Sequence, residues 1–216
     1  MLVACAGSPP PDWKMNAVGQ LENYQQRWLE GDSRTAELNF AKARGELART
    51  GRLDLVARAE LIRCGTRIAS LDFAPCVEYE KLAADASAEE VAYARFLAGD
   101  WQGLNADLLP GHYAELAKAT DAGQRNRTAQ AIADPVARLI AGALLLKRGE
   151  IMPETMALAS QTASEQGWRR PLLAWLQVLA QRAEAAGDGA ALAKLKRQIE
   201  LVLSGKPALP VQSQRP

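Results

Sequence analysis

The sequence predicts an all-α protein built as an irregular stack of helical hairpins. Of its 216 residues, 48% are hydrophobic but only 6% are aromatic, and alanine and leucine dominate. β-Branched residues are scarce, and no run of valine, isoleucine and threonine alternates over the length of a strand. Helix-ending glycines and helix-starting Asp, Ser and Pro residues recur along the chain. A chain of this length can bury one continuous core between such helices.

The first three helices are outlined by apolar residues at three- and four-residue spacing between stop signals. Asp12 is expected to cap a helix that ends at Gly31. Asp32 begins a second helix that is stopped by Gly51, and a third runs over residues 53–71. Residues with short polar side chains at the N-cap and glycine after the last turn are the usual boundaries of helices. Because these signals stand next to each other here, we expect only short turns between the three helices.

The second half repeats this punctuation. Ser87-Ala88-Glu89-Glu90 has the pattern of a capping box, and its helix is expected to end at Gly99. Asp134 followed by Pro135 begins a helix that ends at Gly149, because proline at the first helical position loses no hydrogen bond. Two further starts and two further ends are marked by Pro153, Pro171, Gly187 and Gly205.

One hairpin carries a family resemblance. Residues 28–43 resemble the middle of a tetratricopeptide repeat (TPR), in which a glycine turns between two helices and alanines let them approach closely. The residues at the matching positions are Gly31, Ala36, Phe40 and Ala43. Residues 96–101 echo the turn alone, and the intervals between turns are irregular rather than a steady 34 residues. The resemblance implies a TPR-like α-solenoid, which we expect to be one domain over residues 13–205.

The N-terminus resembles the lipobox of bacterial lipoproteins, with two apolar residues, a small one and a cysteine in Leu2-Val3-Ala4-Cys5. By this resemblance residues 1–4 are residual signal peptide, Cys5 carries lipid, and residues 5–12 form a Pro-rich tether. Ala6, in place of the aspartate that retains such proteins at the inner membrane, implies the periplasmic face of the outer membrane. An ordinary terminal thiol is the alternative for Cys5.

Cys64 and Cys76 form an even pair once Cys5 is assigned to lipid, and an oxidising periplasm favours a disulfide between them. Residues 72–75 can return the chain from the end of the third helix, because six helical residues rise only about 9 Å. Two buried, unlinked thiols are the alternative. At the other end of the chain, residues 206–216 hold three prolines and little to bury, so we expect a disordered tail.

Composition and motifs argue against most catalytic classes. The net charge is +1, from 26 basic and 25 acidic residues, so nothing favours nucleic acid. The single histidine, His112, excludes a His-rich metal site and is expected at a helix start. No phosphate loop, paired CxxC or HExxH motif is present, and we expect no cofactor, metal or catalytic residue. No stretch approaches the roughly 18–20 apolar residues of a membrane span.

The candidate partner contact is the loop of Trp168, Arg169 and Arg170, because an aromatic residue with two arginines is a common anchor for a partner protein. The alternative is that Trp168 fills the joint between two hairpins. The expected function is a non-catalytic, lipid-anchored periplasmic scaffold that presents a concave helical surface to another cell-envelope protein. One alternative is a murein-acting enzyme or its accessory factor, since some such enzymes carry a helical superhelix. Those enzymes attach a separate catalytic lobe, and we expect no segment of this sequence to form one. A purely structural envelope protein is the other alternative.

Overall fold

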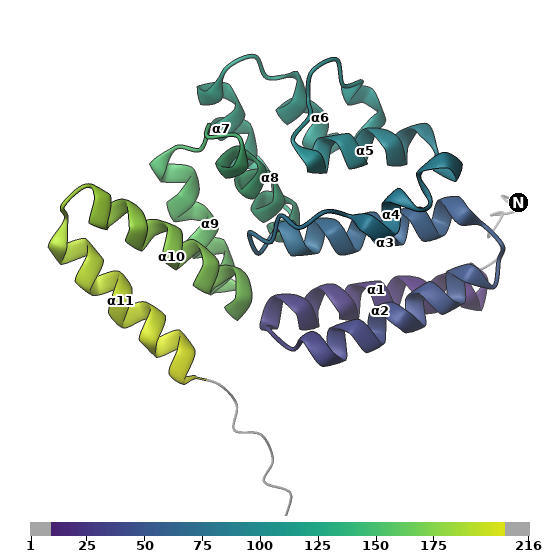
Figure 1. The fold of residues 1–216 in the computed structure, drawn as a ribbon, viewed down its shortest axis with the longest axis horizontal. Coiled ribbons are helices and arrows are strands. Elements are labelled where there is room, and N and C mark those ends of the chain that lie inside the picture. Colours follow the sequence, from purple (N-terminus) through teal and green to yellow (C-terminus); the bar gives the residue numbers. More distant parts are fainter. Residues whose placement is uncertain (1–9, 206–216) are drawn as a thin grey trace, which may run out of the picture.

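A computed structural model describes residues 10–205, and every regular element in that range is a helix (Figure 1). The prediction of an all-α stack of helices is therefore confirmed. The bounds of the helices are α1 (Asp12–Glu30), α2 (Ser33–Ala48), α3 (Leu53–Ile68), α4 (Val77–Glu80), η1 (Ala83–Asp85), α5 (Ala88–Ala98), η2 (Ala106–Leu108), α6 (Gly111–Lys118), α7 (Ala122–Ala131), α8 (Pro135–Lys147), α9 (Pro153–Glu165), α10 (Arg169–Ala185) and α11 (Gly189–Ser204).

The N-terminal hairpin of α1 and α2 turns at Gly31, whose φ of 100° lies in the left-handed region that glycine adopts freely. The side chain of Asp32 then caps α2 by accepting a hydrogen bond from the amide of Thr35. Ala36 is completely buried, as close helix packing requires. The expected cap at Asp12 is wrong: Pro11 holds the cap position, and Asp12 is the first helical residue, where its charge suits the helix dipole.

Helix α3 is the centre of the first half, because it contacts α1, α2, α4, α5 and α8. Figure 1 shows it between the α1–α2 hairpin and the group of α4 to α6. It ends at Ile68, three residues earlier than the sequence predicted. Leu71 adopts a φ of 61°, and the following amide of Asp72 bonds back to the carbonyl of Arg67, which ends the helix without a glycine.

Helix α8 is the centre of the second half and contacts α3, α6, α7 and α9. The side chain of Asp134 caps it, and Pro135 is its first residue, as predicted. Its apolar run is fully buried at Leu139, Ala141, Ala143, Leu144 and Leu145. Helix α10 begins at Arg169 rather than at Pro171, because Trp168 already takes the extended cap conformation.

The two ends of the array meet, since α1 contacts α10. Arg170 donates to the carbonyl oxygen of Trp28 at 2.6 Å, and the indole Nε1 of Trp168 donates to Gln26 at 3.2 Å. In a simple solenoid each repeat contacts only its neighbours, so this contact closes the stack. Helix α11 lies at the edge of the molecule (Figure 1), packs on α10, and has no buried residue.

Candidate functional site

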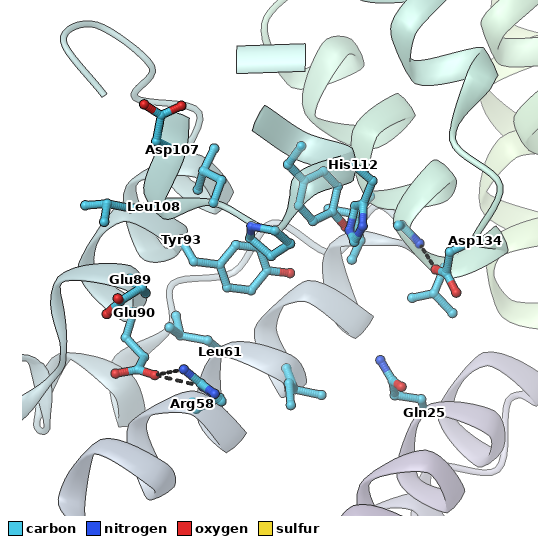
Figure 2. A pocket seen from close by; sticks show the side chains of 17 residues that line it. Gln25, Arg58, Leu61, Glu89, Glu90, Tyr93, Asp107, Leu108, His112 and Asp134 are labelled. Carbon is cyan, nitrogen blue, oxygen red and sulfur yellow. Dashed lines mark hydrogen bonds and ion pairs between the residues drawn. The ribbon is translucent and has the colours of Figure 1, made fainter. Parts of the chain in front are cut away.

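An open groove with a volume of about 600 Å³ lies between α3, α5, α6 and the start of α8 (Figure 2). Buried apolar side chains line it from α3, from α8 and from the turn before α6: Leu61, Ala137, Ile140 and Leu109. Gln25 of α1 lies at one edge. A partly apolar concave surface of this size is typical of a site that takes a small molecule or a side-chain cluster of another protein.

The aromatic side chains of the groove are held by a stack behind them. The rings of Tyr93 and Tyr113 lie 5.9 Å apart at an interplanar angle of 20°, and Tyr113 packs on Phe96 with ring centroids 4.6 Å apart. Gly65 allows Tyr93 to approach α3, because a Cβ there would stand 3.1 Å from the tyrosine hydroxyl oxygen. Burial raises the pKa of Tyr93 to about 12, so its hydroxyl is neutral at physiological pH.

The capping box at the start of α5 places two carboxylates in the groove. The amide of Ser87 donates to Glu90, and the Ser87 hydroxyl accepts from the Glu90 amide, as the sequence predicted. Glu90 is buried and forms an ion pair with Arg58 at 2.8 Å. The neighbouring Glu89 is exposed, and a hydrogen bond from Ser87 lowers its pKa, so it is ionised at neutral pH.

Two more carboxylates line the groove: Asp134 lies across Tyr93 from Glu89, and Asp107 lies above Tyr93 in the view of Figure 2. Asp134 is exposed and accepts the amide hydrogen of Ala137 at 2.6 Å in the α8 cap. Asp107 pairs with Lys118 at 2.9 Å. Figure 2 shows Glu89 and Asp134 at opposite ends of the groove, with Tyr93 between them. The lining thus holds four carboxylates and one guanidinium, and its electrostatic character is acidic.

His112 lines the groove from the first turn of α6, where the sequence placed it. Burial lowers its pKa below 6.5, and the charge of Asp134 offsets this only in part, so the imidazole is neutral at pH 7. No serine, threonine or cysteine lines the groove beside it to act as a nucleophile. Across residues 10–205, no group of three or more His, Cys, Asp or Glu side chains is placed to hold a metal ion.

A second hollow, of about 560 Å³, lies between α9, α10 and α11 over Leu172, Leu176 and Leu179. A third, of about 460 Å³, lies beside Trp101, with the guanidinium of Arg148 4.4 Å from the Trp101 ring centroid. These two hollows are less promising sites, because the second lacks a distinctive charge pattern and the charge of the third is compensated by an ion pair.

The ion pair beside the third hollow is a three-residue network. Arg125 and Arg148 contact the two carboxylate oxygens of Glu150 at 2.9 and 2.8 Å. Burial alone raises the pKa of Glu150, but hydrogen bonds from these two arginines hold it below its usual range. The network joins α7 to the end of α8 and leaves no uncompensated pair of cations to attract an anion.

The expected loop of Trp168, Arg169 and Arg170 is wrong: Trp168 is the N-cap of α10 and the two arginines are its first residues, at the junction of the two ends of the array. Trp168 is buried and Arg170 stacks over the Trp28 ring at 4.1 Å from its centroid, while Arg169 donates to the carbonyl oxygen of Val202. Trp168 therefore fills the joint between hairpins, which was the alternative interpretation. A partner contact at the exposed parts of the two arginines stays a prediction.

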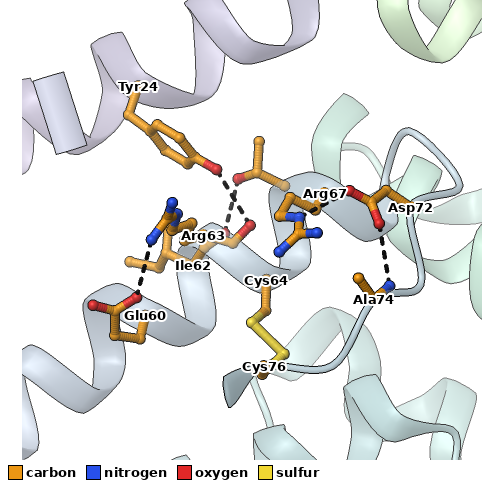
Figure 3. The surroundings of a disulfide bond; sticks show 10 residues. Tyr24, Glu60, Ile62, Arg63, Cys64, Arg67, Asp72, Ala74 and Cys76 are labelled. Atoms are coloured by element: carbon orange, nitrogen blue, oxygen red, sulfur yellow. Dashed lines mark hydrogen bonds and ion pairs between the residues drawn. A yellow bond between two sulfur atoms is a disulfide. The ribbon is translucent and has the colours of Figure 1, made fainter. Parts of the chain in front are cut away.

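The expected cysteine pair lies where the chain returns beneath α3 (Figure 3). Cys64 and Cys76 are at disulfide distance, with Cα atoms 5.9 Å apart. Asp72 shapes the return by accepting hydrogen bonds from Arg67 and from the amide of Ala74, at 2.9 and 3.1 Å. Cys5 and residues 206–216 lie outside the described residues, so lipidation and the expected tail stay predictions.

The sequence patterns identify residues of the groove but not the groove itself. The capping-box pattern at Ser87 to Glu90 and the helix start at His112 both describe the local geometry of these residues. One signal in the sequence could have indicated the groove. The helix starts at Ser87, Pro110 and Asp134 all carry polar residues, and starts of helices that pack side by side can lie close together. Their convergence depends on the packing of α5, α6 and α8 around α3, which local patterns do not specify.

A search against models of known protein families finds no match to this chain. Curated protein sequences and solved structures likewise give no significant match. Within residues 10–205, no helix combines the length and apolar composition that crossing a membrane requires.

Proposed function

We propose that this protein is a non-catalytic periplasmic scaffold, anchored through lipid on Cys5 at the outer membrane, which holds a segment of another cell-envelope protein. The observation that carries the proposal is the groove between α3, α5, α6 and α8, which combines an apolar lining, stacked tyrosines and carboxylates at its edge. Mixed apolar and polar surfaces with aromatic residues are typical of protein contact sites.

The chemistry of the lining favours binding over catalysis. Both carboxylate oxygens of Glu90 are engaged, by Arg58 and by the Ser87 amide. The pKa of Glu89 is lowered rather than raised, so Glu89 does not resemble the protonated acid of a glycosidase. A murein-acting enzyme needs such an acid. Release of soluble fragments from purified peptidoglycan by the folded protein would contradict the proposal.

Site-specific photo-crosslinking tests the groove as a contact site. A photoreactive amino acid at Leu108, which lines the groove, is expected to give a discrete protein adduct in intact envelopes. The same amino acid at the exposed Glu184, near the end of α10, is the control and should not give that adduct. Identical adducts from both positions, or none from Leu108, would contradict the proposed function.

Fractionation tests the anchor separately. The gene with its upstream codons should place the wild-type protein in the outer-membrane fraction, since two lipid signals already give stable attachment. Cys5→Ser should move it to the soluble periplasm. Recovery of both proteins in the soluble fraction would rule out the lipid anchor and leave the groove proposal standing.

A further inference from the structure

The charge pattern of the groove restricts what kind of segment it can hold. Glu89 and Asp134 are exposed, lie at opposite ends, and form no ion pair within residues 10–205. Tyr93 and Leu61 lie between them. A ligand that matches this pattern has an apolar centre and a positive charge at each end.

We propose that the groove binds an extended peptide segment in which two lysine or arginine residues flank a short apolar stretch. This inference rests on the proposed function and specifies the partner chemistry. The two cations contact Glu89 and Asp134, and the apolar side chains between them cover Tyr93 and Leu61. Complementary charges of this kind fix the register of a segment more than they add to its affinity.

The local structure keeps both carboxylates available for such a ligand. Asp134 uses one oxygen, Oδ1, to cap α8, so its second oxygen is free to accept a hydrogen bond from a cation. Glu89 stays ionised because its pKa is lowered. Arg58, the only cation in the lining, pairs with Glu90 and forms no ion pair with Glu89 or Asp134, although its charge contributes to the lowered pKa of Glu89.

Other occupants fit the groove less well. A neutral glycan can stack on tyrosine rings, but it carries no positive charge to pair with the carboxylates at the two ends of the groove. An anionic ligand is repelled by them. A second copy of this chain offers basic residues on α11, at Lys194, Lys196 and Arg197, so self-association is tested as an outcome below.

Three capped peptides of equal length provide the probes: Gly-Lys-Leu-Leu-Leu-Lys-Gly and its counterparts with both lysines replaced by glutamine or by glutamate. Binding is measured by titration of the isotope-labelled protein, from the amide chemical shifts of the residues that line the groove. An exposed ion pair changes affinity by about 1.4- to fivefold. The lysine peptide is therefore expected to bind about two- to thirtyfold more tightly than the glutamine peptide, and the glutamate peptide more weakly than both.

The double variant Glu89→Gln/Asp134→Asn removes both charges while the amide of asparagine still caps α8. It should bind the lysine peptide no more tightly than the glutamine peptide, and its affinity for the glutamine peptide should be unchanged. The matched control is Glu184→Gln/Asp188→Asn, which removes one exposed and one helix-capping carboxylate outside the groove. It should bind all three peptides like the wild type.

Several results would overturn the inference, and they differ from failure of the proposed function. Equal binding of the lysine and glutamine peptides would refute the role of charge while the crosslink at Leu108 still supports a protein contact. A crosslink at Leu108 without any peptide binding would show that the partner has another chemistry. Shifts of the groove amides caused by an N-acetylglucosamine tetramer, or self-association lost in the double variant, would identify a glycan or a second copy instead.

Discussion

The clearest test of the closed stack is the replacement of Arg170 by alanine. Its guanidinium donates hydrogen bonds to the Trp28 carbonyl oxygen and to the Ser33 hydroxyl, each at 2.6 Å, and stacks on the Trp28 ring. A hydrogen bond from a charged donor contributes about 1.5–3 kcal/mol, and a cation–π contact about 0.5–2 kcal/mol. Arg170 is half-buried and Ser33 is exposed, so the lower values apply. We expect Arg170→Ala to lower the free energy of unfolding by about 2–4 kcal/mol.

A loss of this size corresponds to a fall of about 4–16 °C in Tm for a protein of this length. Urea denaturation followed by circular dichroism measures it directly. Arg170→Lys should recover less than half of the loss, because an ammonium group cannot reproduce the planar fork that reaches both acceptors. Arg34→Ala, at an exposed arginine of α2, is the control and should change stability by less than about 0.5 kcal/mol. An unfolding midpoint of Arg170→Ala equal to that of the control would refute the closing contact.

Three further predictions concern stability. Cys64→Ala should lower the free energy of unfolding by about 3 kcal/mol in the chain-entropy model. Reducing agent should lower the urea midpoint of the wild type but not of this variant, and two free thiols in unreduced, denatured protein would contradict the bond to Cys76. Ala36→Leu should lower the free energy of unfolding by about 1–3 kcal/mol, because it overpacks the α1–α2 contact. Ala41→Leu, on the exposed face of the same helix, should lower it by less than about 0.5 kcal/mol, and equal urea midpoints of the two variants would place Ala36 in solvent. Glu150→Gln should cost about 1–3 kcal/mol at pH 7. Because the folded-state pKa of Glu150 lies below its ordinary 4.5, that difference should shrink as the pH falls below 4.5, and a constant difference down to pH 2 would refute it.

Local signals in the sequence predicted α2, α5 and α8 well, whereas α4 and α7 were not predicted. Gly31 and Gly99 end helices in left-handed conformations, and Ser87 and Asp134 cap helices as expected. These features depend on a few neighbouring residues, so the sequence contains all the necessary information. The end of α3 was misplaced because Leu71, a residue that rarely takes a positive φ, adopts the conformation that glycine usually provides.

The candidate groove and the closing contact could not be read from local patterns. Glu89, His112 and Asp134 come together only because α5, α6 and α8 pack around α3. Arg170 and Trp28 are separated by 142 residues, and neither carries a local mark of the other. Single-sequence periodicity indicates which face of a helix is buried, but it does not indicate against which helix.

The contact between α1 and α10 also determines the order in which the molecule can be completed. A linear array of hairpins can nucleate at any point and grow by neighbouring contacts alone. Here the last apolar and charged contacts of Trp28 wait until Arg170 has left the ribosome, because chains are synthesised from the N-terminus. Closing a loop of this length costs entropy, and contacts that form within the loop, such as those between α3 and α8, shorten the segment that remains to be closed. The α1–α2 hairpin is therefore synthesised long before the segment that completes its contacts.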